Sequence, residues 1–182
     1  MSPLHATKIS RFLSLVLRHQ PETIGIVLSN DGWTSVDGLI AAVNRHGQAL
    51  DFETLEHVVE TNDKKRFAFS DDGEMIRANQ GHSVEVNLGY QPTAPPEFLH
   101  HGTVARFLPS IRENGIQKGQ RHNVHLSASR EVANTVGKRR GEPVILTVRA
   151  LEMNAAGHEF HLSANGVWLT DFVPVQFIQF ES

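Results

Sequence analysis

Apolar positions in the first 60 residues recur at the spacing of amphipathic helices. In residues 8–19 they fall three and four positions apart, which places them on one face of a helix. These side chains are Ile9, Phe12, Leu13, Val16 and Leu17. Pro21 ends this helix, because its ring prevents continuation and biases Gln20 away from helical backbone.

Two further helices are predicted before residue 60. One follows the Asn30-Asp31-Gly32 turn, carries an apolar face through Leu39 and Val43, and ends at Gly47. The other begins at Asp51, whose carboxylate suits an N-cap because it accepts hydrogen bonds from the first unpaired backbone N–H groups. Its apolar positions form one face, and they are Phe52, Leu55, Val58 and Val59.

The hydrophobic period then changes from 3.6 to 2, which indicates strands. Residues 66–69 and 74–77 alternate in polarity on either side of Asp71-Asp72-Gly73, a turn sequence typical of a β-hairpin. Three helices followed by a hairpin predict a winged-helix lobe over residues 1–80.

Glycine and proline residues separate this lobe from the rest of the chain. Residues 81–96 are rich in both and contain few apolar anchors, so we expect a linker with a short strand around residues 84–86. Beyond the linker, strand and helix patterns alternate, which predicts an α+β lobe over residues 97–182. The expected strands are 98–101, 124–126, 144–148, 167–170 and 175–180, and the expected helices are 108–114 and 131–136, with Pro109 in a first helical turn.

Composition restricts the function classes. The formal net charge of the 182 residues is -3, so a nucleic-acid ligand would need a local basic cleft rather than a general basic field. The chain has no cysteine, which excludes disulfides, thiolate zinc sites and a cysteine nucleophile. The N-terminus lacks signal-peptide features and no apolar run approaches the ~20 residues that span a bilayer, so we expect a soluble, cytoplasmic protein without membrane contact.

Three arginines stand in distinctive local settings. Arg18 precedes His19 at the end of the first helix, Arg66 lies in an alternating strand, and Arg121 opens a run that ends in a predicted strand. Guanidinium groups stay charged and fork-shaped, so three that met at one point would hold a phosphate through several bonds. The alternatives are a favourable charge at the helix C-terminus for Arg18 and a solvated strand charge for Arg66.

Five short motifs stand in a distinctive order, joined by residues 76–83. They are Leu17-Arg18-His19-Gln20-Pro21, Lys64-Lys65-Arg66-Phe67, His101-Gly102-Thr103, the 121–127 run with its Val-His-Leu-Ser end, and Gly-Val-Trp-Leu-Thr at 166–170. The set resembles the RNA 2'-phosphotransferase family over nearly the whole chain, from about residue 10 to residue 180. These NAD-dependent enzymes remove an internal 2'-phosphate from RNA, and their known fungal role is in tRNA splicing.

The resemblance implies a winged-helix RNA lobe and an ADP-ribosyltransferase-like NAD lobe. It also implies a reaction in two steps. The RNA 2'-phosphate first displaces nicotinamide from NAD, which joins RNA to ADP-ribose. The adjacent ribose hydroxyl then attacks phosphorus, which releases RNA with a 2'-hydroxyl and ADP-ribose 1'',2''-cyclic phosphate.

The resemblance also assigns residues. Arg18, His19, Arg66 and Arg121 would be catalytic, gripping the 2'-phosphate, and the neighbouring Lys64 and Lys65 would hold backbone phosphates of the RNA. A separate set would bind NAD, with His101 on the adenosine ribose and the backbone of Gly102 on the nicotinamide amide. That set is His101, Gly102, Thr103, Ser110, Ile111, Gly115, His125 and Ser127.

Each NAD assignment has a structural alternative. His101-Gly102-Thr103 is expected to end a strand and start a helix, and a simple turn would explain it equally well. Ser110, Ile111 and Gly115 would also suit an ordinary helix end, and His125 would suit a hydrogen-bonded core histidine. Asn123 departs from the family, which commonly has histidine or an aromatic residue there.

Metal binding is not expected. Histidines are frequent, with pairs such as His122/His125 and His158/His161, but no carboxylate completes a convincing ligand set. The expected partners are therefore NAD and an RNA with an internal 2'-phosphate, bound by a monomer. Two alternatives remain: another ADP-ribosyltransferase that modifies terminal nucleic-acid phosphates or protein, and a non-enzymatic winged-helix nucleic-acid-binding protein.

Overall fold

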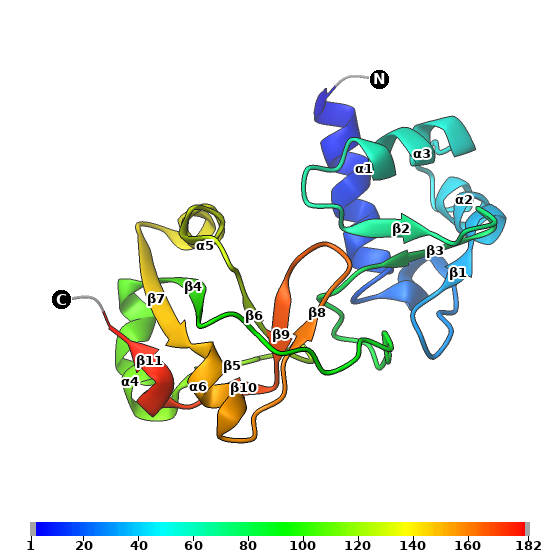
Figure 1. The fold of residues 1–182 in the computed structure, drawn as a ribbon. Helices are drawn as coiled ribbons and strands as arrows, with labels where there is room; N and C mark the ends of the chain where they lie inside the picture. Colours follow the sequence, from blue (N-terminus) through cyan, green and yellow to red (C-terminus); the bar gives the residue numbers. More distant parts are fainter. Residues whose placement is uncertain (1–2, 181–182) are drawn as a thin grey trace. The chain divides into compact units, whose positions relative to one another are not determined.

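The computed structural model describes residues 3–180, which divide into two compact units, one extending to Gly89 and the other beginning at Tyr90 (Figure 1). Both units mix helices with antiparallel strands, so the predicted α+β class is confirmed. Within the described residues, no helix has the length and apolarity that crossing a membrane requires.

Three α-helices form much of the first unit, and all three were predicted. The first is shifted toward the N-terminus relative to the predicted residues 8–19: it begins at Pro3 and ends at Val16, and residues 17–19 form a turn. Asp51 caps α3 as expected, accepting a hydrogen bond from the backbone N of Thr54 at 2.8 Å. The helices are α1 (Pro3–Val16), α2 (Val36–Arg45) and α3 (Phe52–Glu60), with a 3-10 turn at Pro21–Ile24.

A three-stranded antiparallel sheet completes this unit, in the order β1-β3-β2. The predicted hairpin is confirmed by β2 (Phe67–Phe69) and β3 (Met75–Ala78). β1 (Thr34–Ser35) was not predicted, because two residues are too few to show alternation. A hydrophobic core joins the sheet to the helices, with Leu13, Leu39, Leu55 and Ile76 fully buried.

The segment after the hairpin contains no strand, so the prediction around residues 84–86 is wrong. Its backbone hydrogen bonds go to turns of the first unit rather than to a neighbouring strand. The backbone N atoms of Ser83 and Val84 both donate to the carbonyl of Arg18, at 2.8 and 3.3 Å, and Asn87 N donates to Asn30 O at 2.7 Å. Residues 83–87 therefore belong to the first unit's fold.

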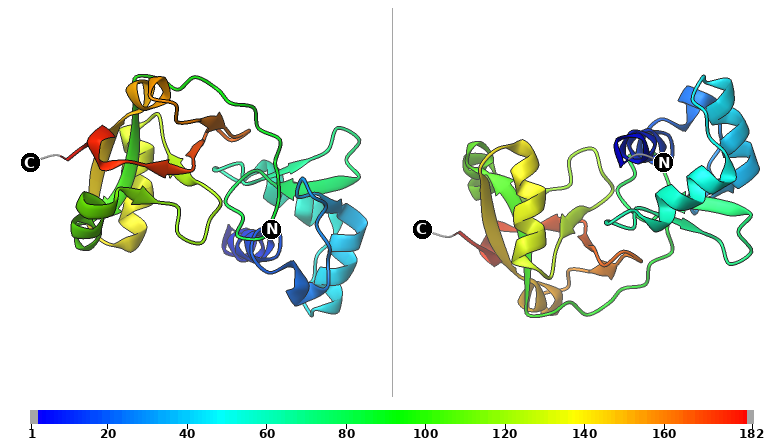
Figure 2. Two further views of the ribbon diagram at one scale, coloured as in Figure 1. Left: turned by 90° about the horizontal axis from the view of Figure 1, so that it is seen from below. Right: turned by 90° about the horizontal axis from the view of Figure 1, so that it is seen from above.

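Two sheets and one strand pair build the second unit (Figure 2). One sheet has the order β11-β7-β4 and the other β6-β9-β8, while β10 pairs with β5. Its strands are β4 (Phe98–Val104), β5 (Ile116–Gln117), β6 (Val124–Leu126), β7 (Pro143–Arg149), β8 (His161–Leu162), β9 (Trp168–Thr170), β10 (Phe172–Val173) and β11 (Ile178–Gln179).

Two reciprocal backbone hydrogen bonds between His100 and Ser127, 2.8 and 2.9 Å long, connect β4 to the end of β6. This connection brings two of the predicted NAD-binding motifs side by side. The helices of the unit are α4 (Leu108–Asn114), α5 (Arg130–Gly137) and α6 (Ala150–Ala155), with 3-10 turns at Ala105–Phe107, Lys138–Arg140 and Val175–Phe177.

Several predictions for this unit need correction. The strand expected at 175–180 is a 3-10 turn followed by the short β11, because the chain turns directly after Pro174. His101-Gly102-Thr103 lies inside β4 and not at a strand-to-helix turn, since β4 continues to Val104. Three short strands (β5, β8 and β10) and helix α6 were not predicted.

Candidate active site

Arg18 and Arg66 lie together in the first unit. Arg18 follows α1 in a turn that continues the helix, since His19 N donates to Leu15 O at 2.9 Å. Its Nη2 atom donates to the backbone carbonyl of Arg66 at 3.4 Å, and its guanidinium carbon lies 5.9 Å from the ring centroid of Phe67. The structure thus brings the Arg18 side chain to the backbone of Arg66, 48 residues away in the sequence.

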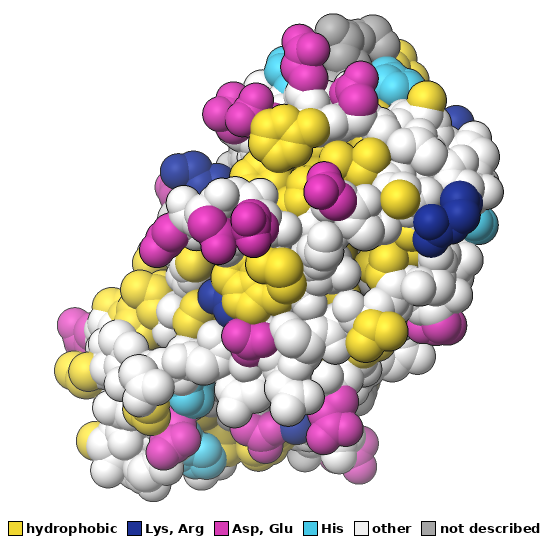
Figure 3. Space-filling model, turned by 90° about the vertical axis from the view of Figure 1, so that its right-hand side faces the viewer, with side chains coloured by type: hydrophobic (Ala, Val, Ile, Leu, Met, Phe, Trp, Pro, Cys, Tyr) yellow, Lys and Arg dark blue, Asp and Glu magenta, His cyan; other side chains and the backbone are white. Residues whose placement is uncertain are grey.

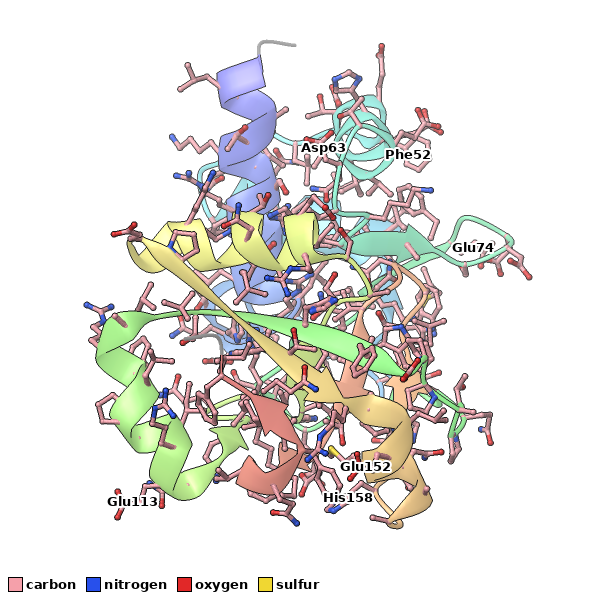
Figure 4. All side chains as sticks on the ribbon, turned by 60° about the vertical axis from the view of Figure 1, so that its left-hand side comes forward. Phe52, Asp63, Glu74, Glu113, Glu152 and His158 are labelled. Atoms are coloured by element: carbon pink, nitrogen blue, oxygen red, sulfur yellow. The ribbon has the colours of Figure 1, made fainter. Side chains whose placement is uncertain are left out.

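A second set of hydrogen bonds orients Arg66. The side-chain carbonyl of Asn62 accepts from the backbone N of Arg66 and from its Nη1, at 3.2 and 3.3 Å. Burial lowers the pKa of the Arg66 guanidinium, and the carboxylate of Asp63 opposes that shift. Asp63, labelled in Figure 4, lies in the segment that connects α3 to β2. The partly desolvated guanidinium stands to gain from an approaching anion.

The backbone around Arg66 is held by Asn79. The Asn79 side chain, 3% exposed, donates from Nδ2 to the carbonyl of Lys65 at 2.6 Å, and its backbone N donates to Arg66 O at 2.8 Å. Lys65 has a φ of 40°, in the left-handed region that side chains other than glycine disfavour. Asn79 therefore stabilises the strained turn that precedes Arg66.

His19 is positioned by the segment after the hairpin. Its Nδ1 atom shares a hydrogen bond of 2.9 Å with Ser83 Oγ, and Ser83 N is bound to the carbonyl of Arg18. Neither Asn79 nor Ser83 was singled out from the sequence as a site residue. The only signal was their place in residues 76–83, the segment that joins the motifs of the resemblance.

A polar cluster also forms in the second unit, between β4 and β6. His101 Nδ1 lies 3.2 Å from the backbone carbonyl of His125, which can only accept, so this nitrogen carries the proton. Arg121 Nη1 lies 3.0 Å from His125 Nδ1, which must accept from the guanidinium. Three predicted residues from two motifs therefore interact directly, and the Oγ of the neighbouring Ser127 accepts from Ser129 N at 3.1 Å.

The family comparison extends over almost the entire chain. The model of the "RNA 2'-phosphotransferase, Tpt1 / KptA family" matches residues 5–172. The chain belongs to this family.

Curated bacterial proteins agree with this RNA 2'-phosphotransferase assignment. The chain is 57% identical to a probable RNA 2'-phosphotransferase of Pseudomonas aeruginosa over 171 residues, which cover 93% of this chain and 94% of that protein. Proteins with the same name from Flavobacterium johnsoniae and Streptomyces coelicolor are 52% and 50% identical. The Flavobacterium alignment covers 97% of this chain and 97% of that protein, and the Streptomyces alignment covers 99% of this chain and 98% of that protein.

Packing explains the glycine of this 2'-phosphotransferase's His-Gly-Thr motif. A Cβ atom built on Gly102 would lie 1.9 Å from the backbone oxygen of Ala133 in α5, closer than atoms can approach. Gly102 thus lets α5 pack directly on β4. Thr103 beside it is 5% exposed. The NAD roles of Gly102 and Thr103 remain predictions.

The other predicted NAD residues of this 2'-phosphotransferase lie around α4. Ser110 is exposed on the helix, whereas Ile111 is 8% exposed and packs in the hydrophobic core of the unit. Gly115 ends α4 with a φ of 71°, and a Cβ there would lie 2.3 Å from Val173 O. Ile111 and Gly115 therefore have structural roles, and their contacts with NAD remain predictions.

Proposed function

We propose that this chain is an NAD-dependent enzyme that removes an internal 2'-phosphate from RNA in two steps. Nicotinamide leaves in the first step, and ADP-ribose 1'',2''-cyclic phosphate and RNA with a 2'-hydroxyl are released in the second. Family membership and the names of the relatives support the phosphotransferase activity. The NAD requirement and the two steps are the parts of the proposal that experiment must test.

The pairing of Arg18 and Arg66 carries the proposal. The two side chains line one cleft, and each is held by a hydrogen bond: Arg18 Nη2 donates to the backbone carbonyl of Arg66, and Arg66 Nη1 donates to Asn62 Oδ1. Guanidinium groups with restricted positions can bind a dianionic phosphate without a large loss of side-chain entropy. His19, held by Ser83, is the third group of this set and a candidate proton donor to the leaving ribose oxygen.

The β4–β6 cluster of the second unit is the proposed NAD site. When bound, NAD would supply an activated ribose carbon with nicotinamide as its leaving group. The donors at this cluster fit a polar dinucleotide, because His101, Arg121 and Ser127 offer imidazole, guanidinium and hydroxyl groups around His125. We assign Arg121 to the phosphate in the second step, where a fixed cation stabilises the charge that develops on the phosphoryl oxygens.

No step in the proposal needs a metal ion, because guanidinium groups neutralise the phosphate. Within the residues that the structure describes, no three His, Asp or Glu side chains group at metal-binding distance. The absence of a metal requirement remains a prediction, which the presence of a chelator in the assay tests directly.

The test is an assay on a short RNA with one internal 2'-phosphate, with and without NAD, in EDTA. We expect NAD-dependent loss of the phosphate and an equal amount of ADP-ribose cyclic phosphate. A persistent ADP-ribosylated RNA would instead identify a different ADP-ribosyltransferase that lacks the second step. RNA binding without any nicotinamide release would identify a non-enzymatic binding protein.

A further inference from the structure

A cleft of about 450 Å³ runs along α1 in the first unit, opposite the segment that connects α3 to β2. Arg18 and Arg66 line one part of it. The rest is lined by residues that include Arg11 and Ser14, to which no role has been assigned, and Lys64, which the family resemblance places on backbone phosphates of the RNA. The cleft is therefore larger than one phosphate group requires.

The cleft is basic although the protein is not. Four of its lining residues are Lys or Arg, namely Arg11, Arg18, Lys64 and Arg66, against the single lining carboxylate Asp63 among the described residues. The whole chain has a formal net charge of -3, and on the face drawn in Figure 3 Lys and Arg form separate groups among scattered acidic side chains. The positive potential is thus concentrated where Arg18 and Arg66 lie.

Helical geometry extends this positive potential along one line. Arg11, Ser14 and Arg18 are three and four residues apart, so they lie on one face of α1 and its continuing turn. With a rise of 1.5 Å per residue, Arg11 lies ~10 Å along the axis from Arg18. A ligand that contacts both arginines must therefore be extended and must carry several negative charges.

Hydrogen bonds across the cleft hold its two walls together. Asn62 Nδ2 donates to Ser10 Oγ of α1 at 2.9 Å, while Asn62 Oδ1 accepts from Arg66. Ser10 is 9% exposed. One amide group thus links α1 to the Arg66 side of the cleft, so the cleft does not have to form when a ligand arrives.

We propose that this cleft binds the sugar-phosphate backbone of the substrate RNA beside the nucleotide that carries the 2'-phosphate, with Arg11 and Lys64 contacting flanking phosphates. The inference rests on the proposed function. A single RNA strand has the required properties, because it is extended and carries a negative charge at every phosphate. Lys65 has no part in this subsite, since it does not line the cleft.

Direct binding tests the subsite separately from catalysis. A fluorescent single-stranded decanucleotide without a 2'-phosphate would be titrated with the wild-type protein, Arg11→Ala and Arg11→Lys. Arg45→Ala is the matched control, because Arg45 is an exposed arginine of the same unit that lies outside the cleft. We expect several-fold weaker binding for Arg11→Ala, partial recovery in Arg11→Lys, and a salt dependence shallower by about 0.7 in the log–log slope for one lost phosphate contact on a single strand.

Turnover then connects the subsite to the reaction. The ratio of kcat/KM for a 2'-phosphorylated decanucleotide to that for a 2'-phosphorylated dinucleotide should fall in Arg11→Ala and not in Arg45→Ala. Equal effects of the two variants on binding and on this ratio would overturn the subsite. Failure of the wild-type protein to remove phosphate from either RNA would overturn the proposed function instead, and the binding assay would still decide the subsite.

Discussion

The side-chain carbonyl of Asn62 accepts two hydrogen bonds from Arg66, one from its backbone N at 3.2 Å and one from its Nη1 at 3.3 Å. Asn62 therefore sets both where Arg66 enters β2 and where its guanidinium points. Its amide nitrogen is bound to Ser10 in α1, so the orientation of Arg66 depends on a helix 52 residues distant from Asn62.

Asn62→Ala should reduce kcat/KM for the 2'-phosphorylated RNA by about tenfold or more, because hydrogen bonds to charged groups contribute ~1.5–3 kcal/mol. The matched control is Asn44→Ala, which removes the hydrogen bonds of Asn44 with Leu50 N and O in the same unit. Thermal unfolding and steady-state kinetics would be measured on both variants. Equal loss of stability with equal loss of activity would contradict a positioning role for Asn62.

Arg18→Ala and Arg66→Ala should remain folded and lose most turnover, since removal of a preorganised donor costs on the order of 3 kcal/mol. Circular dichroism would report the fold, and product analysis would report RNA dephosphorylation. Wild-type turnover in either variant would remove that arginine from the proposed site.

Arg121→Ala should separate the two steps. The variant loses the contact with His125 Nδ1, so we expect slower release of the cyclic phosphate than of nicotinamide and accumulation of ADP-ribosylated RNA. Rapid-quench sampling with separation of RNA species would detect that product. A parallel decline of both releases, with no accumulation, would mean that Arg121 acts in binding.

Gly102→Ala should destabilise the second unit by ~1–3 kcal/mol or more, because the added methyl group cannot fit beside Ala133 O without moving α5. Gly38→Ala is the matched substitution. Gly38 lies in α2, and a Cβ there would be 3.4 Å from the Cβ of the N-cap residue Ser35, an ordinary contact, so the substitution should stabilise the protein by ~0.5–1 kcal/mol through helix propensity. Chemical denaturation of both variants would show whether the free energy of unfolding falls in Gly102→Ala and rises in Gly38→Ala.

Acid should weaken the first unit through the cap of α3. Hydrogen bonds from Thr54 lower the pKa of Asp51, so the folded state binds its proton less readily than the unfolded chain. This stabilisation is present above the unfolded pKa near 4 and disappears as the pH falls through the lower folded value. Asp51→Asn keeps a capping oxygen and should flatten the stability profile between about pH 5 and 3, measured by urea denaturation. If the stability of Asp51→Asn depended on pH as that of the wild type does, the Asp51 cap would not be the cause of the acid sensitivity.

The sequence by itself determined the elements whose causes are local. Asp51 begins α3 because its carboxylate accepts a hydrogen bond from Thr54 N three residues later, and Pro21 begins the 3-10 turn that follows α1, where its missing N–H and fixed φ are tolerated. The α+β class and the order of the family motifs were also readable from residues close together in the chain. Periodicity failed at β1, β5, β8 and β10, which are too short to repeat.

Only the tertiary structure decided how the site is assembled. The Arg18 side chain donates to the carbonyl of Arg66, and the Asn79 side chain donates to the carbonyl of Lys65. Gly102 stands inside β4 because α5 packs against the strand there, and it does not form the turn that a glycine suggests locally. Asn79 and Ser83 carry no pattern that marks them as supports of Arg66 and His19. The physical reason is range: capping and periodicity depend on neighbours within about four residues, whereas these contacts depend on which distant backbone groups packing brings within hydrogen-bond distance.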